Sequence, residues 1–162
     1  MTSANLAHAR GRSRLGRLLL LVLDWLEAIP YWVLALPLRF GLAWIFWNAG
    51  QVKLMSWDMT LAFFRDEYRV PLLPPELAAN MALTIELTTP VLLVLGLFTR
   101  PAVLVLFGMT AVIQIFVYPE AWPTHLQWVA MMLVLCAHGA GKFSLDHVLW
   151  RWVEPRLIDA RS

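Results

Sequence analysis

Four polar side chains lie inside long apolar segments of this chain: Arg39, Asn48, Glu86 and Gln114. Glu86 is the clearest case, because it interrupts the otherwise apolar run of residues 78–98. An ionisable side chain at membrane depth usually faces protein, water or a partner, and it often marks a ligand site or a proton pathway. Glu86 is therefore the first candidate for a functional residue, either as part of a small-ligand site or as a carrier of protons.

The depth of these groups follows from the helical rise of about 1.5 Å per residue. Glu86 is predicted about 12 Å and Gln114 about 10 Å below the outer membrane boundary, so the two share one level. Arg39 lies roughly 6 Å deeper, within reach of Glu86 for an extended arginine. Two interpretations stay open. In one, an Arg39–Glu86 pair with Asn48 and Gln114 pins the helices together; in the other, Glu86 serves a ligand or a proton.

A metal site is the alternative raised by the sulfur and imidazole side chains near the last apolar segment. The candidates are Met131, Met132, Cys136, His125 and His138, soft ligands of the kind that favour Cu(I). The two histidines are thirteen residues apart, about 220° around a helix, and the adjacent methionines diverge in the same way. We interpret these residues as packing and interface residues, with copper as the alternative. The nine tryptophans similarly indicate an interface belt, with a flat quinone-like ligand as the sharper alternative.

The elements that must position these residues are membrane-spanning helices. The chain is 60% hydrophobic and only 15% charged, whereas soluble domains are about 25% charged. Four apolar segments are predicted to cross the bilayer, at residues 31–53, 78–98, 101–118 and 125–138, the last of them short. Arg100 and Pro101 are predicted to stop the second segment, and Pro101 to start the third. The predicted fold class is an all-α integral membrane four-helix bundle.

Three shorter helices are predicted to lie on the membrane surfaces, at the N-terminus, in the first outer loop and at the C-terminus. Residues 18–29 are too short to span, and residues 143–162 include Ser144 as a helix cap and Asp146 as a complement to the helix dipole. The outer loop places Trp57, Leu61, Phe64 and Tyr68 on one helical face. The predicted divisions are a basic tail and interfacial helix at 1–30, the bundle at 31–142 and the C-terminal helix and tail at 143–162.

Charge and cysteine usage limit the partners and the chemistry. Arginines and lysines gather in the N-terminal tail and the C-terminal segment, so the positive-inside rule places both termini in the cytoplasm. The net charge of +2 gives no ground for a nucleic-acid partner, and the lipid bilayer is the expected one. The single cysteine, Cys136, excludes an internal disulfide and dithiol chemistry, so redox work would need a partner or a cofactor.

Several segments together resemble the DoxX family. The segment LRFGLAWIFWNAGQVKL is similar to the first-span pattern of that family through Arg39, Gly41, Phe46, Gly50 and Lys53. The segments FFRDEYRVPLLPPELAA, IELTTPVLLVLGLFTRPA and HGAGKFSLDHVL continue the resemblance through Glu86, Pro90, Gly96, Arg100, Gly141, Lys142, Ser144 and Asp146, over residues 35–150. The resemblance implies a four-helix protein of the bacterial inner membrane. The family is related to the small subunit of a thiosulfate:quinone oxidoreductase, and some members belong to systems that handle thiol or oxidative stress.

Two classes of function follow. In the first, the chain is a membrane subunit of a redox or thiol-stress system, with Arg39, Glu86 and Gln114 lining a pocket for a quinone-like ligand. In the second, it is a non-enzymatic accessory or scaffold in a copper-stress or secreted metal-binding peptide system, and its outer loop, residues 56–76, docks a partner. Both imply a membrane or periplasmic protein partner, and a homo-oligomer is compatible with either. Membership of the family does not decide whether the chain is an enzyme.

Overall fold

The structure, a computed structural model, describes residues 14–159, and over that range it is helical with no strand. Residues 1–13 of the predicted basic tail, including Arg10 and Arg12, lie outside the described residues, whereas Arg14 and Arg17, predicted as tail, belong to α1. In chain order the helices are α1 (Arg14–Glu27), α2 (Tyr31–Met55), α3 (Trp57–Ala62), the π-helical turn η2 (Phe63–Tyr68), α4 (Pro75–Leu95), α5 (Thr99–Val112), the π-helical turn η3 (Ile113–Val117), the 3₁₀ turn η4 (Pro119–Ala121), α6 (Trp122–His138) and α7 (Leu145–Asp159).

The predicted all-α membrane fold is confirmed. Three helical stretches in the described part of the chain are long and apolar enough to cross a bilayer: Tyr31–Met55, Pro75–Leu95 and Thr99–Val117. The fourth, α6, has 17 residues and a length of about 25 Å, slightly less than the hydrocarbon core of about 30 Å. It begins at Trp122, three residues before the predicted start at His125, because Pro123 occupies the first turn, where its missing N–H does no harm.

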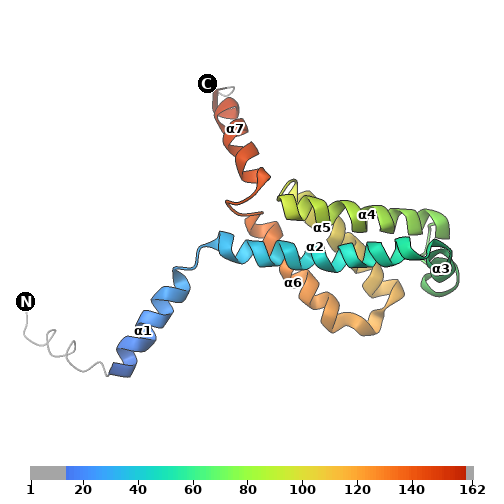
Figure 1. Ribbon diagram of the computed structural model, residues 1–162, viewed down its shortest axis with the longest axis horizontal. Coiled ribbons are helices and arrows are strands. Elements are labelled where there is room, and N and C mark those ends of the chain that lie inside the picture. Colours follow the sequence, from blue (N-terminus) through green and yellow to red (C-terminus); the bar gives the residue numbers. More distant parts are fainter. Residues whose placement is uncertain (1–13, 160–162) are drawn as a thin grey trace, which may run out of the picture.

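The bundle is built on a long antiparallel contact between α2 and α4, with α5 and α6 packed beside them (Figure 1). Its core takes residues from all four helices: Leu42, Ala43, Phe46, Leu93, Val103, Leu106, Met132 and Leu135. Membrane helices associate through close packing and hydrogen bonds, and small residues let backbones approach. At Gly50 a Cβ would lie 2.8 Å from Leu87 Cδ2 and 3.2 Å from Glu86 Cβ, so only glycine permits the observed approach of α2 to α4.

The end of α4 differs from the prediction. The helix stops at Leu95, not at the predicted Phe98, because Gly96 turns into the left-handed region with φ 64°. The N–H of Leu97 donates to Leu92 O at 2.9 Å and that of Gly96 to Leu93 O at 3.1 Å, the pair of bonds that defines a Schellman cap. Consequently α5 begins at Thr99, two residues before the predicted start at Pro101.

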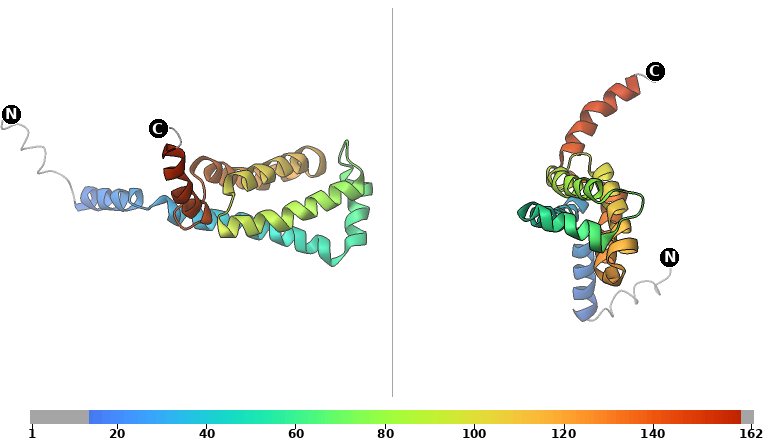
Figure 2. Two further views of the ribbon diagram at one scale, coloured as in Figure 1. Left: turned by 90° about the horizontal axis from the view of Figure 1, so that it is seen from above. Right: turned by 90° about the vertical axis from the view of Figure 1, so that its right-hand side faces the viewer.

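A short perpendicular cap closes one end of the bundle, which we call the α3 end (Figure 2). Phe64 is buried there against Ala78, Ala79 and Ala82 of α4, with Trp57, Leu61, Tyr68 and Val70 packed around it. The predicted apolar face of this outer segment is thereby confirmed. The opposite end, from which α1 and α7 project, is called the termini end (Figures 1 and 2).

The start of α7 connects neighbouring helix ends at the termini end of the bundle. Ser144 caps this helix, as predicted, by accepting a hydrogen bond from the His147 N–H at 3.2 Å. Asp146 does something that the sequence analysis missed: its carboxylate accepts the backbone N–H groups of Phe98 at 2.7 Å and Thr99 at 2.9 Å. It therefore supplies the N-terminal cap of α5, whose own flanking residues have no capping side chain.

Candidate functional site

The four polar residues predicted to form one intramembrane cluster occupy separate places. Arg39 lies at the termini end, Glu86 lies between α2 and α4 near the α3 end, Gln114 lies between α5 and α6, and Asn48 is exposed on α2. Neither of the two pockets described below is lined by Arg39, Glu86 and Gln114 together. The site must therefore be sought in the contacts that each residue makes.

Arg39 is bound by backbone carbonyls, not by Glu86, so the predicted Arg39–Glu86 pair is wrong. The buried guanidinium donates to Leu93 O at 2.7 Å, Val94 O at 2.6 Å, Phe143 O at 2.7 Å and Ala140 O at 3.2 Å. The first two are carbonyls of the last turn of α4, where the helix dipole is negative, and Leu93 O also accepts the Gly96 N–H of the helix cap. Glu86 lies seven residues before Leu93, about 10 Å along the helix. Arg39 thus fastens α2 to α4 and to the segment before α7.

Glu86 pairs instead with Lys53, a residue that the sequence analysis treated only as part of a family pattern. The distance from Lys53 Nζ to Glu86 Oε1 is 2.7 Å, and Glu86 is only 2% exposed. Its second oxygen, Oε2, is buried and has no hydrogen-bond partner. One feature of the sequence could have pointed to Lys53 as a residue facing the bundle. Lys53 is fourteen residues from Arg39, so the two lie on nearly the same face of α2.

Gln114 forms the third polar site with His125, and the two face each other between α5 and α6. Gln114 Oε1 lies 2.6 Å from His125 Nδ1, while Gln114 Nε2 donates to Pro119 O at 2.8 Å. Because an amide oxygen only accepts, this contact requires a proton on His125 Nδ1, and in that neutral tautomer Nε2 is an acceptor. His125 is 5% exposed. The sequence analysis considered it only as a metal ligand or an interface residue.

Both residues line a pocket of about 450 Å³. The remaining lining residues are Phe107, Thr110, Ala111, Trp122, Leu126 and Val129. Trp122 and Leu126 are largely exposed on the outside of the bundle, so the pocket opens sideways, toward the surface that faces lipid. An apolar pocket with a small number of polar groups is the usual form of a small-molecule site.

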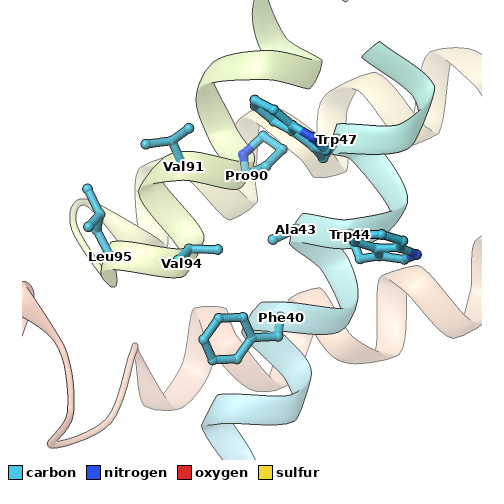
Figure 3. A pocket seen from close by; sticks show the side chains of 8 residues that line it. All are labelled: Phe40, Ala43, Trp44, Trp47, Pro90, Val91, Val94 and Leu95. Atoms are coloured by element: carbon cyan, nitrogen blue, oxygen red, sulfur yellow. The ribbon is translucent and has the colours of Figure 1, made fainter. Parts of the chain in front are cut away.

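A second, wholly apolar groove runs between α2 and α4 (Figure 3). Phe40, Trp44 and Trp47 of α2 face Pro90, Val91 and Leu95 of α4 across a space of about 340 Å³. Aromatic rings and aliphatic side chains dominate this lining, and its only polar side-chain groups are the indole N–H donors of Trp44 and Trp47. The groove fits an acyl or prenyl chain better than a headgroup.

A further polar chain lies at the α3 end, where η2 meets η3. Tyr118 Oη is 3.3 Å from Glu67 Oε1 and 3.2 Å from Tyr68 Oη. Burial, and then the hydrogen bond with Tyr118, raise the pKa of Tyr68 well above its usual value. Tyr68 therefore stays protonated at every physiological pH.

The residues of the copper alternative do not share one place. Met132 is buried in the core, with Met131 and Cys136 packed against it. His138 is exposed, its Nδ1 lies 3.3 Å from Val134 O, and its ring lies 5.1 Å from that of Tyr31. Among residues 14–159, no group of three or more histidine, cysteine, aspartate or glutamate side chains is arranged to hold a metal ion.

Comparison with known proteins gives one family. The sequence profile of the DoxX family matches residues 34–119, the part of the chain that contains α2, α4 and α5. A protein of Haemophilus influenzae, described only as an uncharacterized protein, is 30% identical over an alignment 134 residues long that covers 76% of this chain and 88% of that protein. No solved structure matches the chain.

Proposed function

Because this chain belongs to the DoxX family of multi-pass membrane proteins, we propose that it is the membrane subunit of a redox system and binds a quinone-like headgroup. The site is the pocket between α5 and α6 that Gln114 and His125 line. A partner protein carries out the electron chemistry. The observation that carries the proposal is the hydrogen-bonded amide and imidazole in an otherwise mostly apolar, lipid-facing pocket.

The two side chains supply complementary hydrogen-bonding groups. Gln114 uses one N–H for Pro119 O and has a second N–H to donate, and His125 has Nε2 as an acceptor. A quinone carbonyl needs a donor, and the hydroxyl of the reduced quinol needs an acceptor. The pair thus suits a headgroup that alternates between the two forms, and the imidazole can take the proton that a quinol releases.

The shape and position of the pocket support the same class of ligand. Its volume of about 450 Å³ lies within the range of small-molecule sites, about 300–1,000 Å³. A ligand dissolved in the bilayer reaches it sideways past Trp122 and Leu126, and its prenyl tail stays in lipid. Phe107 and Trp122 supply aromatic faces against which a flat ring stacks.

A partner is required because the chain has one cysteine and therefore no dithiol pair of its own. The α3 end offers a place for it. Leu72 is fully exposed at the tip of the segment between η2 and α4, with φ 70°, and Arg69 has φ 40°. Non-glycine residues in this conformation are strained, and such strain gathers at functional sites. The same observation favours the second candidate function, a scaffold whose outer loop docks a partner.

The test is binding of a short-tailed benzoquinone to the purified protein in detergent, followed by quenching of tryptophan fluorescence. We expect His125→Phe and Gln114→Leu to weaken binding by about ten- to hundredfold, since each leaves a headgroup oxygen unpaired. His138→Phe and Gln127→Leu are the matched controls on α6, because both residues are exposed outside the pocket. Equal affinity in all five proteins would overturn the proposal.

A further inference from the structure

Glu86 has a carboxylate oxygen that the ion pair with Lys53 leaves unused. Oε1 accepts a hydrogen bond from the Lys53 ammonium, while Oε2 is buried and has no hydrogen-bond partner. Glu86 as a whole is only 2% exposed. Buried polar atoms without partners are rare in folded proteins, and each one needs an explanation. A proton on Oε2 is one such explanation, provided that a route joins this oxygen to the solution.

We infer that Glu86 exchanges a proton with the solution at the α3 end, through Tyr68 and Tyr118. The outer end of this chain is the exposed carboxylate of Glu67, 3.3 Å from Tyr118 Oη, and Tyr118 Oη is 3.2 Å from Tyr68 Oη. Tyr118 has one hydroxyl hydrogen and two acceptors within reach, so its hydroxyl donates to Glu67 or to Tyr68 in turn. Rotation between two acceptors is what a proton relay needs.

Tyr68 carries the chain to the inside. It packs against the cluster of Phe64, Ala78, Ala79 and Ala82 with its ring against that of Phe64, and Ala82 lies one helical turn before Glu86 on the same face of α4. Glu86 Oε2 has no direct hydrogen-bond partner, so the proposed relay needs a bridging water for its last step. The raised pKa of Tyr68 keeps its phenol neutral, as a relay that both donates and accepts requires.

The charged groups around Glu86 determine how proton transfer changes the net charge of this site. Lys53 from α2 and Tyr68 from η2 are the titratable groups that face Glu86. The titratable residue of α3, Asp58, is exposed, and that of α5, Arg100, donates to Ala137 O at the termini end. Uptake of one proton from the solution converts the Glu86 carboxylate into a carboxylic acid beside the Lys53 ammonium. Release along the same chain restores the neutral ion pair, so each cycle balances one proton in against one out.

Backbone geometry at both tyrosines supports a functional role. Tyr68 ends the π-helical turn η2, and Tyr118 directly follows the π-helical turn η3. Single π turns are rare and are found frequently at functional sites. This inference does not rest on the ligand proposed above, because it concerns proton exchange in the absence of any quinone.

The experiment measures the full-length protein in liposomes by infrared spectroscopy after a pH jump. The signal is the carbonyl stretch of a protonated carboxylic acid, assigned with isotope-labelled glutamate and by its loss in Glu86→Gln. We expect this band to rise as the pH falls. Tyr68→Phe and Tyr118→Phe should slow its appearance about tenfold or more, with the final amplitude unchanged, because each removes a relaying hydroxyl. Tyr31→Phe, the remaining tyrosine of the chain, is the matched control at the termini end.

Three results would overturn the inference: a Glu86 band that does not change with pH, equal rates in the wild type and both phenylalanine variants, or equal slowing by Tyr31→Phe. The tyrosine variants retain Glu86 and Lys53, so the inference stays testable if Glu86→Gln fails to fold. A rate that depends on Tyr68 and Tyr118 but not on Tyr31 supports it. That result stands even if the protein binds no quinone.

Discussion

At the residue scale, α2 supplies two cations to α4, and the protein neutralises them in different ways. Arg39 is held by four carbonyl oxygens and needs no carboxylate, since the guanidinium presents five N–H donors in a fixed geometry. Lys53 is a point charge and pairs with Glu86. Each arrangement lowers the penalty for a charge within the bundle, but only the second contains a carboxylate, which can take up and release a proton.

The Lys53–Glu86 pair gives the first prediction. Lys53→Met or Glu86→Gln alone should lower the free energy of unfolding by about 3 kcal/mol, because each leaves one buried charge without its partner. The double variant should lose less than the sum of the two losses. Unfolding in mixed detergent micelles measures all three. Arg39→Met is the control for coupling: combined with Glu86→Gln it should give an additive loss. Coupling of Glu86 to Arg39 but not to Lys53 would contradict the observed contacts.

The residues of the candidate site were only partly predictable. Glu86, Arg39 and Gln114 stand out in the sequence because polar side chains are rare in apolar helices. Their partners do not, since depth counted along a helix says nothing about rotation around it. Arg39 was predicted about 6 Å deeper than Glu86 and within its reach, but it meets the carbonyls of Leu93 and Val94. Lys53 lies at the end of α2, where a lysine usually faces the interface, and the cap formed by α3 was needed to enclose it.

At the element scale, a junction of loops and helix ends holds the termini end together. Gly96 ends α4, Asp146 caps α5 and donates its own N–H to Gly96 O at 2.8 Å, and Arg39 binds carbonyls on both sides. Arg100 adds a bond to Ala137 O at the end of α6. The family-like residues around FTRP and HGAGKFSLD are thus explained by helix capping and close packing.

Gly96 gives the second prediction, with Gly108 as its control. A Cβ at Gly96 would lie 2.5 Å from Ser144 Cβ and 2.7 Å from Arg39 Nη2, at φ 64°, so Gly96→Ala should destabilise the protein by about 2 kcal/mol or more. Gly108 lies inside α5 with open space around it, so Gly108→Ala should raise stability slightly, by about 0.5–1 kcal/mol. Melting temperatures in detergent compare the two. Equal effects would contradict this account of the junction.

Helix existence was predictable from hydropathy, while helix ends and π turns were not. The apolar run continues through Leu97 and Phe98, so composition alone extends α4 past its true end at Leu95. The end of α4 is set by the left-handed conformation of Gly96 and by the hydrogen bond that the Asp146 N–H donates to Gly96 O. The π turns at Phe63–Tyr68 and Ile113–Val117 have no sequence signature of comparable strength, because they arise where two elements pack against each other.

At the scale of the whole molecule, four antiparallel helices return the chain to the end at which it entered. Tyr31 at the start of α2 donates to Gly139 O after α6 at 2.7 Å, so α1 and α7 leave from one side of the bundle. We propose, from the distribution of lysine and arginine, that this side is cytoplasmic and that the α3 end faces the periplasm. The pocket of Gln114 and His125 then lies nearer the periplasmic face.

The third prediction tests this orientation by cysteine labelling of intact cells. In a Cys136→Ser background, Asp66→Cys at the α3 end should react with a membrane-impermeant maleimide, and Lys142→Cys at the termini end should react only after the cells are opened. Both side chains are exposed, so accessibility differs only through the membrane. The opposite pattern would reverse the orientation and place the tyrosine relay on the cytoplasmic side.

The central claim is that the pocket between α5 and α6 holds a quinone-like headgroup. It is tested most directly by measuring which quinones co-purify with the protein from its own membrane. Wild type, His125→Phe, Gln114→Leu and the control His138→Phe are extracted into lipid nanodiscs without detergent exchange, and bound quinones are quantified by mass spectrometry against total lipid. We predict stoichiometric quinone in the wild type and in His138→Phe, and loss of most of it in the two pocket variants. Quinone at its bulk membrane ratio in all four proteins would contradict the claim.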